Sequence, residues 1–229
     1  MSDNVKKLCL LLGIFCCTFV LNGCGNIKTI TTSKEEDKFK TEYESLNGKE
    51  KEGTKYVSVS IPSQNRMVYP SFSELMDLFD HGTGVIYFGF PECPWCRNAV
   101  PVLIDAVKEL GIEKIYYFNA RDMRDTKVLN ELGEVVTEKE GTKEYYQLLA
   151  ALGNYADVYD GLNDEAIKRL YFPTVVVVKN GKIIGTHVST VASQTDPTIP
   201  LKEEQKEELK EIYQTYLTKI ANSMCGEAC

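Results

Sequence analysis

The chain has 229 residues, of which 43% are hydrophobic and 26% are charged. This composition is that of an ordinary globular protein, and it excludes a wholly disordered chain, a collagen-like chain and a protein with many membrane spans. There are 33 Asp and Glu residues against 26 Lys and Arg, which gives a net charge of −7. Because an acidic chain without a basic stripe repels phosphates, we expect no nucleic-acid partner.

The N-terminus has the pattern of an export signal. Two lysines precede an apolar run over residues 8–20, which is too short to span a bilayer comfortably. The run ends in residues 21–24 (LNGC), which resemble the lipobox of bacterial lipoproteins. The resemblance implies a signal peptide over residues 1–23, lipid on Cys24, and a protein anchored on the extracytoplasmic face of the cell membrane. A plain cleaved signal or an uncleaved anchor is the alternative.

The eight cysteines divide between this signal and the rest of the chain. Three lie within the signal, and those that remain are Cys24, Cys93, Cys96, Cys225 and Cys229. Outside the cytosol disulfides form and persist. We therefore expect an accessory disulfide between Cys225 and Cys229 in a C-terminal tail over residues 223–229.

The chain between the signal and the tail has two parts. Residues 24–54 are rich in Thr, Ser, Lys, Glu and Gly, and they are expected to form a flexible membrane tether with one short helical stretch around residues 39–46. Residues 55–222 are expected to form one folded domain. No internal repeat is visible.

Strands and helices alternate along the domain. Short, nearly continuous apolar runs are typical of buried strands, and apolar residues at helical spacing are typical of amphipathic helices. Asn180-Gly181 is a strong hairpin signal. Strands are expected over residues 56–61, 85–90, 112–118, 172–178 and 182–188, and helices over 71–81, 94–110, 142–152 and 202–220. This order predicts an α/β fold with a central mixed sheet flanked by helices.

The motif that carries chemistry is Cys93-Pro94-Trp95-Cys96, where a buried strand gives way to a helix. A thiolate at a helix N-terminus meets the positive end of the helix dipole and free N–H groups, so its pKa falls below the ordinary value of about 8.5. Cys93 is therefore expected to be the exposed nucleophile. Cys96 lies one turn further on, where it can resolve a mixed disulfide.

Four features together resemble the thioredoxin family. They are the CxxC motif after a strand, Pro101 in the following helix, Pro173-Thr174 before a strand, and residues 179–182 (KNGK) in the final hairpin. The resemblance implies a thioredoxin-like fold with an enlarged insert, about residues 120–171, before the strand of the cis-proline. It also implies a cis peptide bond before Pro173 and a substrate groove built from Pro94, Trp95, Phe172, Pro173 and Thr174.

A narrower resemblance and two departures qualify this assignment. Residues 87–103, with the lipobox, resemble thioredoxin-like lipoproteins of Gram-positive bacteria, some of which are called bacteriocin transport accessory proteins. Tyr87 stands where thioredoxins have a buried aspartate. Glu92 replaces the usual aromatic residue before the first cysteine, and its carboxylate either raises the pKa of Cys93 or takes part in proton transfer at Cys96.

These observations predict a thiol–disulfide oxidoreductase. Its partners are protein or peptide thiols and disulfides, and neither an organic cofactor nor a metal is implied. The sequence fixes neither the direction of electron flow nor the redox partner. The alternative is a non-catalytic accessory or binding lipoprotein for exported peptides that keeps the fold. The insert either borders the groove at Cys93 or decorates the far side of the domain.

Overall fold

The computed structural model describes residues 33–224, with side chains to residue 221. The expected signal peptide over residues 1–23, the lipidation site Cys24 and the pair Cys225–Cys229 lie outside these residues and stay predictions. None of the helices within residues 33–224 has both the length and the apolar character needed to cross a membrane.

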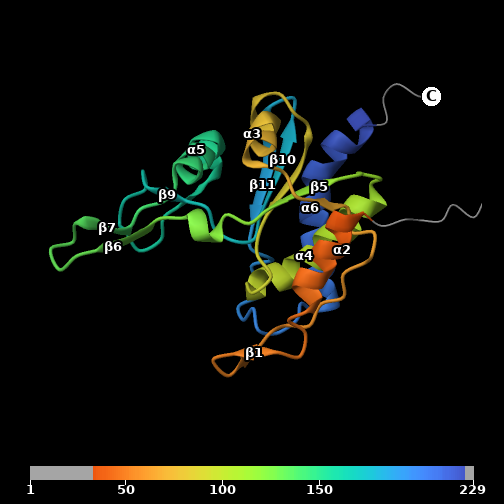
Figure 1. The fold of residues 1–229 in the computed structure, drawn as a ribbon, viewed down its shortest axis with the longest axis horizontal. Helices are drawn as coiled ribbons and strands as arrows, with labels where there is room; N and C mark the ends of the chain where they lie inside the picture. The colour runs from red at the N-terminus through yellow and green to blue at the C-terminus, as the bar shows by residue number, and fades with distance from the viewer. Residues whose placement is uncertain (1–32, 225–229) are drawn as a thin grey trace, which may run out of the picture. The chain divides into compact units, whose positions relative to one another are not determined.

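A five-stranded mixed sheet forms the centre of the described domain, with the strand order β11-β10-β4-β5-β3. The strands β3, β4 and β5 are parallel, whereas β10 runs antiparallel to both β4 and β11. Their bounds are β3 (Met67–Val68), β4 (Gly84–Phe88), β5 (Ile115–Phe118), β10 (Thr174–Lys179) and β11 (Lys182–Val188). Helices cover both faces (Figure 1), so the predicted α/β, thioredoxin-like fold is confirmed by this topology.

The helices divide between the two faces of the sheet. Helix α4 (Pro94–Glu109) packs along α6 (Glu203–Met224), and α2 (Lys34–Glu44) lies on the same side (Figure 1). Helix α3 (Phe72–Asp80) lies on the opposite side, where it contacts α5 (Lys143–Leu152). Both faces of the sheet are therefore buried, which explains why β4 has no exposed residue.

Local sequence signals account for the ends of several elements. Ser71 and Glu74 form a capping box at the start of α3, as their spacing predicts. The hairpin between β10 and β11 turns at Asn180 and Gly181, with φ angles of 49° and 73°. A Cβ at Gly181 would lie 2.3 Å from the carbonyl oxygen of Asp80, so glycine is required both by the backbone and by the close approach of α3.

The strand expected over residues 56–61 is wrong. This segment is extended and alternately buried, but it joins no sheet, and β3 takes the edge position instead. Its backbone groups bond to side chains: Asn47 binds both the N–H and the carbonyl of Val59, and Glu44 accepts the N–H of Ile61. Alternating burial is common to a strand and to such a side-chain-bonded segment, so the sequence pattern does not separate them.

The flexible tether expected over residues 24–54 is also corrected within the described residues. Ser33 and Glu36 cap helix α2, which begins earlier than the expected stretch at residues 39–46. Phe39 and Tyr43 of this helix are fully buried in the core. The small hairpin that follows, β1 (Glu50–Lys51) and β2 (Thr54–Lys55), is exposed. The folded domain therefore includes α2 and does not begin at residue 55.

The insert after β5 has its own structure. The expected helix at residues 142–152 is confirmed as α5, which buries Tyr145, Leu148 and Leu152 and leaves Tyr146 37% exposed. Two small hairpins extend beside it (Figure 1). The remaining elements are η1 (Arg121–Met123), β6 (Thr126–Leu129), β7 (Val135–Lys139), η2 (Gly153–Tyr155), β8 (Asp157–Val158) and β9 (Lys168–Arg169).

Candidate active site

The CPWC motif lies where the sequence predicts, at the junction of β4 and α4. Cys93 is the N-cap of α4, and its sulfur accepts a hydrogen bond from the N–H of Cys96 at 3.4 Å. Pro94 occupies the first helical position, where a missing N–H costs nothing. Both cysteines are free thiols in this structure. The sulfur of Cys93 therefore caps the N-terminus of α4.

The loop before β10 brings the proline to the same place. The Phe172–Pro173 peptide bond is cis, as predicted. The thiol of Cys93 lies 3.7 Å from the carbonyl oxygen of Phe172, to which it can donate a hydrogen bond. Thr174 is buried, and its hydroxyl donates to the carbonyl of Tyr171 at 2.8 Å. The structure thus joins Cys93 to the proline loop, while the side chain of Thr174 holds that loop instead of lining an open groove.

The expected exposure of Cys93 is corrected. Its exposed fraction is only 6%, against 0% for Cys96. The proline loop accounts for this, because the carbonyl of Phe172 contacts the sulfur. Trp95, which we expected in the groove, is half-buried and packs against the core beside Thr190 and Val191. The difference between the two thiols is therefore less one of exposure than of their electrostatic surroundings.

Those surroundings separate the two thiols. The hydrogen bond with Cys96 is the main cause that lowers the pKa of Cys93, and the N–H groups of the helix start and the charge of Arg124 act in the same direction against burial. Complete burial raises the pKa of Cys96 well above its ordinary value, and the neighbouring Cys93 adds to this. Cys93 is thus the thiol that ionises first, and Cys96 stays protonated beneath it.

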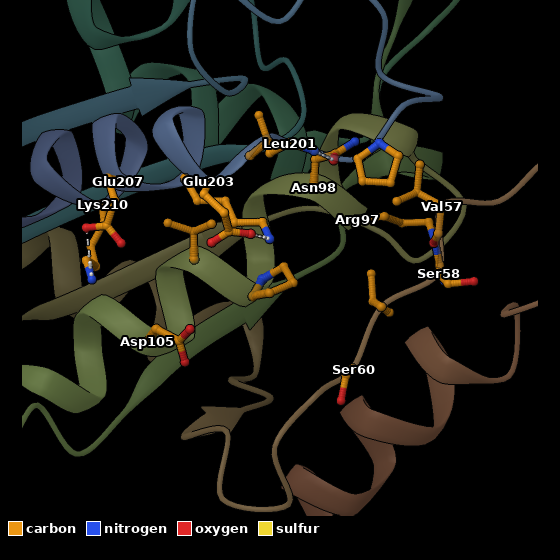
Figure 2. A pocket seen from close by; sticks show the side chains of 15 residues that line it. Val57, Ser58, Ser60, Arg97, Asn98, Asp105, Leu201, Glu203, Glu207 and Lys210 are labelled. Carbon is orange, nitrogen blue, oxygen red and sulfur yellow. Dashed lines mark hydrogen bonds and ion pairs between the residues drawn. The ribbon is translucent and has the colours of Figure 1, made fainter.

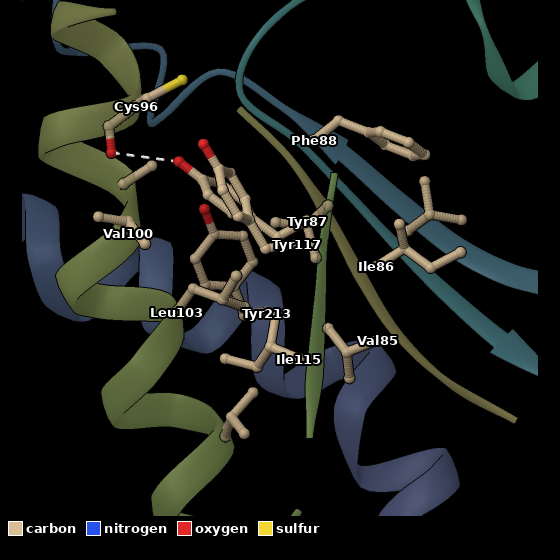
Figure 3. Close-up of a cluster of buried hydrophobic side chains, with 14 of the residues drawn as sticks. Val85, Ile86, Tyr87, Phe88, Cys96, Val100, Leu103, Ile115, Tyr117 and Tyr213 are labelled. Atoms are coloured by element: carbon tan, nitrogen blue, oxygen red, sulfur yellow. Dashed lines mark hydrogen bonds between the residues drawn. The ribbon is translucent and has the colours of Figure 1, made fainter. Parts of the chain in front are cut away.

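Buried tyrosines lie under Cys96. The hydroxyls of Tyr43 and Tyr87 are 3.1 Å apart, and the Tyr87 hydroxyl lies 3.5 Å from the carbonyl oxygen of Cys96. Figure 3 shows the side chains of Tyr87, Tyr117 and Tyr213 gathered between the sheet and this turn of α4. Burial raises the pKa of Tyr43 and Tyr87 well above the ordinary value for tyrosine. These phenols therefore stay protonated and act as hydrogen-bond donors.

Glu92 faces the insert. Its carboxylate forms an ion pair with Arg121 of η1, with 3.3 Å between Oε2 and Nη1, and both side chains are partly exposed. The Arg121 guanidinium also lies 4.9 Å from the ring centroid of Phe90, next to the motif. The hydrogen bonds of the described residues connect Glu92 to Arg121 and not to either sulfur. Its predicted part in proton transfer stays a prediction.

The insert reaches the site through a second arginine. The Arg124 guanidinium lies 4.5 Å from the ring centroid of Phe172 and donates from Nη1 to the carbonyl of Leu170 at 3.1 Å. It thereby contacts the loop that touches Cys93. The start of the insert consequently borders Cys93. Of the two placements considered from the sequence, the groove at Cys93 and the far side of the domain, this is the first.

Two residues that position the site were missed by sequence reasoning. Tyr43 was assigned to the tether, although its capping-box residues Ser33 and Glu36 signal a helix. Arg97 follows Cys96 directly and is buried, donating to the carbonyls of Tyr43, Val57 and Pro91 and to the side chain of Asn47. This arginine ties α2 to the loop that carries the motif. No sequence signal identifies it, because buried arginines are rare.

A separate cavity of about 380 Å³ lies beside the first turns of α4 (Figure 2). It is bounded by residues 57–60, α4 and the start of α6, and neither cysteine nor Pro173 lines it. Its lysines are paired within its own wall, Lys206 with Glu203 at 2.7 Å and Lys210 with Glu207 at 3.3 Å. We therefore assign this cavity no part in the chemistry of the cysteines.

Within residues 33–221, no group of three or more His, Cys, Asp or Glu side chains is placed to hold a metal ion. The geometry instead leaves two thiols, an acceptor carbonyl and phenol donors. Such a set is suited to thiol–disulfide exchange, in which sulfur is both nucleophile and leaving group.

Comparison with known proteins finds similar solved structures only. No family model matches the chain, and no curated protein matches it. Among solved structures, thioredoxin O1 and thioredoxin O2 from Arabidopsis thaliana, both in the oxidized state, are similar to it. Their identities are 15% and 16%, they cover 65% and 67% of this chain and 99% of their own, and the TM-scores are 0.34 and 0.32. The assignment of a thioredoxin-like fold rests on the strand order and on the position of the cis-proline.

Proposed function

We propose that the protein is a thiol–disulfide oxidoreductase in which Cys93 attacks and Cys96 resolves. The observation that carries the proposal is the position of the Cys93 sulfur, at the N-terminus of α4 and 3.7 Å from the carbonyl of the cis-proline loop. We infer that an extended substrate backbone passes beside the sulfur at this carbonyl. The lowered pKa of Cys93 supports the assignment of the nucleophile.

The exchange runs in two steps. In the first, the Cys93 thiolate attacks one sulfur of a substrate disulfide; the substrate S–S bond breaks, a mixed disulfide forms, and the other sulfur leaves and takes up a proton. In the second, Cys96 loses its proton and attacks the sulfur of Cys93, which releases the second substrate thiol and leaves a Cys93–Cys96 disulfide. Two electrons pass from the protein to the substrate, and the reverse order of steps oxidises a substrate dithiol.

The second step needs help at Cys96, because burial raises the pKa of that thiol. Tyr87 lies at this turn, and its hydroxyl is held by Tyr43. A phenol that stays protonated can stabilise a developing thiolate by donating a hydrogen bond. We assign this positioning role to Tyr87, which stands where the family that the sequence resembles has a buried aspartate that helps to move protons.

A trapping experiment tests the function. Reduced Cys96→Ser protein mixed with a peptide disulfide is expected to stop at a mixed disulfide on Cys93, which mass spectrometry identifies. Cys93→Ser protein is expected to form no adduct, and the wild type to release both thiols. Release of both thiols by the Cys93→Ser variant would overturn the proposal.

One observation favours the second candidate, a non-catalytic binding protein for exported peptides. Cys93 is only 6% exposed, as expected of a thiol kept for structure. The two candidate functions differ in whether the cysteines are required for activity. A binding protein with Cys93→Ser and Cys96→Ser together would still capture peptides, whereas an oxidoreductase would lose all turnover.

The proposed location is the extracytoplasmic face of the cell membrane, with a lipid on Cys24. It rests on the two lysines and the apolar run over residues 8–20, and on the lipobox-like residues 21–24. Cys24→Ala is expected to move the protein from the membrane fraction or to block its processing. Unchanged, correctly processed protein in the membrane fraction would point to another anchor.

A further inference from the structure

Two arginines of the insert lie beside the site without a carboxylate partner. Arg124 and Arg169 form no ion pair with any side chain in the described part of the chain, 33–221. They are near each other, because Arg124 donates to the carbonyl of Leu170, the residue that follows Arg169. Burial and the nearby charge of Arg169 both lower the pKa of Arg124. Like charges are seldom placed together in a protein unless an anion meets them.

Two of the neighbouring carboxylates are already paired, and a third, Asp157, lies opposite Arg169 in the antiparallel pairing of β8 and β9 without forming an ion pair with it. Glu92 pairs with Arg121 at 3.3 Å. Asp125, which is nearly buried, lies 3.6 Å from Lys127. Neither Arg124 nor Arg169 therefore forms an ion pair with a carboxylate of the described residues, although the whole chain is acidic at −7.

The two guanidinium groups are held by aromatic faces and keep free donors. Arg124 lies 4.5 Å from the centroid of Phe172, and Arg169 lies 4.2 Å from that of Tyr159. Arg124 uses one Nη1 N–H, toward Leu170, and its Nε is buried, so the donors left for a ligand are the remaining Nη N–H groups. A guanidinium has five donors in a planar fork that matches a carboxylate. Both groups are thus fixed in place with donors to spare.

We propose that Arg124 and Arg169 form a carboxylate-binding subsite, which selects disulfide substrates that carry an acidic group next to the reacting sulfur. The proposal rests on the oxidoreductase function and names its substrate class. Phe172 links the subsite to the chemistry, since one of its faces meets Arg124 and its carbonyl meets the Cys93 thiol. The acidic group comes either from a side chain of a peptide substrate or from a small carboxylate-bearing thiol.

Three small disulfides of similar size test the charge preference. They are dithiodipropionate, which is anionic, hydroxyethyl disulfide, which is neutral, and cystamine, which is cationic. With reduced full-length protein under single-turnover conditions, we expect dithiodipropionate to be reduced about tenfold faster than the neutral disulfide at low salt, and cystamine to be slowest. Added salt should shrink these ratios. Peptide disulfides with Glu, Gln or Lys beside the cysteine are compared in the same way. The class of substrate with the larger ratio of anionic to neutral rates, peptide or small disulfide, is the one that the subsite favours.

Variants assign the preference to the two arginines. Arg169→Gln is expected to lower the ratio of anionic to neutral rates about threefold, and Arg124→Lys, which keeps the charge but not the fork, by less. Lys182→Gln is the matched control, because Lys182 is exposed in the hairpin beyond β10, at the end of the sheet where β4 begins and Cys93 does not lie. It should leave the ratios unchanged.

Each outcome decides something. Equal rates for the three disulfides, or a ratio that falls as much in Lys182→Gln as in Arg169→Gln, would overturn the subsite and leave the oxidoreductase function standing. Failure of the wild type to reduce any of the disulfides would instead overturn the proposed function. Circular dichroism and thermal unfolding of each variant show whether a lost ratio reflects a lost fold.

Discussion

Two regions outside the five-stranded sheet reach the cysteines, and they do so from different sides. Helix α2 contributes Phe39 and Tyr43, both fully buried, and Tyr43 meets Tyr87 beneath Cys96. The insert contributes Arg124, which contacts the proline loop at Cys93. Its outer hairpin is exposed, with Leu132 at 83%. One region is thus part of the core, while the other borders the nucleophile and extends into solvent.

The two regions therefore influence the CPWC motif in different ways. Helix α2 supplies buried apolar surface and the Tyr43 hydroxyl. Substitutions in α2 should therefore alter the packing of the core and the surroundings of the Cys96 thiol. Changes at the start of the insert act through charge and through access to Cys93.

The largest expected effect is on stability. Phe39→Ala removes a fully buried ring that meets Tyr43 and Tyr117, with ring centroids at 4.5 and 4.9 Å. It should lower the free energy of unfolding by about 3–5 kcal/mol. Leu132→Ala in the exposed hairpin is the control, with an expected change within about 0.5 kcal/mol. Urea unfolding measures both; similar values for the two would mean that α2 is not part of the core.

A somewhat smaller loss is expected at Arg97. Lysine keeps the charge but cannot replace a fork that bonds to the carbonyls of Tyr43 and Pro91 and to the side chain of Asn47. Arg97→Lys should therefore cost about 2–3 kcal/mol, since buried carbonyls lose their donors. Lys143→Arg on the exposed start of α5 is the control for the exchange itself, and it should be neutral. A neutral Arg97→Lys would show that α2 is held by apolar packing alone.

Sequence reasoning recovers the motif and four of the five strands of the sheet because their signals are local. The buried run of β4, the turn at Asn180-Gly181 and the N-cap at Cys93 each depend on neighbouring residues. The cis bond at Pro173 followed from the family resemblance, and it is found. Elements of this kind are fixed by residues within a few positions of one another.

The features that were missed depend on contacts distant in the chain. Residues 56–61 have the alternation of a strand, but Asn47 and Arg97 take their backbone bonds. Tyr43 reaches Tyr87 over 44 positions, and Cys93 is covered by Phe172 over 79. Such pairings are decided by which segments compete for the same surface, so no short window of sequence contains them.

The next prediction compares the two thiols. Because the pKa of Cys93 is lowered and that of Cys96 is raised, limiting iodoacetamide should label Cys93 at least about tenfold faster at neutral pH. The rate at Cys93 should rise with pH around a midpoint below the ordinary value for a thiol, which is about 8.5. Peptide mapping by mass spectrometry reads both sites. Faster labelling of Cys96 would reverse the assigned roles.

The smallest expected effect concerns the hydroxyl that joins α2 to Cys96. Tyr87→Phe keeps the ring, which stacks on Tyr117 at 5.8 Å, and removes only the group between Tyr43 and the Cys96 turn. The second step of exchange should slow about three- to tenfold, since a hydrogen bond to a developing charge is worth about 1 kcal/mol or somewhat more. Single-turnover release of the second thiol from a preformed mixed disulfide on Cys93 isolates that step.

Tyr213→Phe is the matched control, because the Tyr213 hydroxyl is equally buried near Cys96 but has no hydrogen-bond partner in the described residues. Its removal should leave the step unchanged and leave stability unchanged or slightly higher. Equal slowing by the two substitutions would mean that polarity around Cys96 matters and the Tyr43–Tyr87 pair does not, so that α2 would act on the site through packing alone.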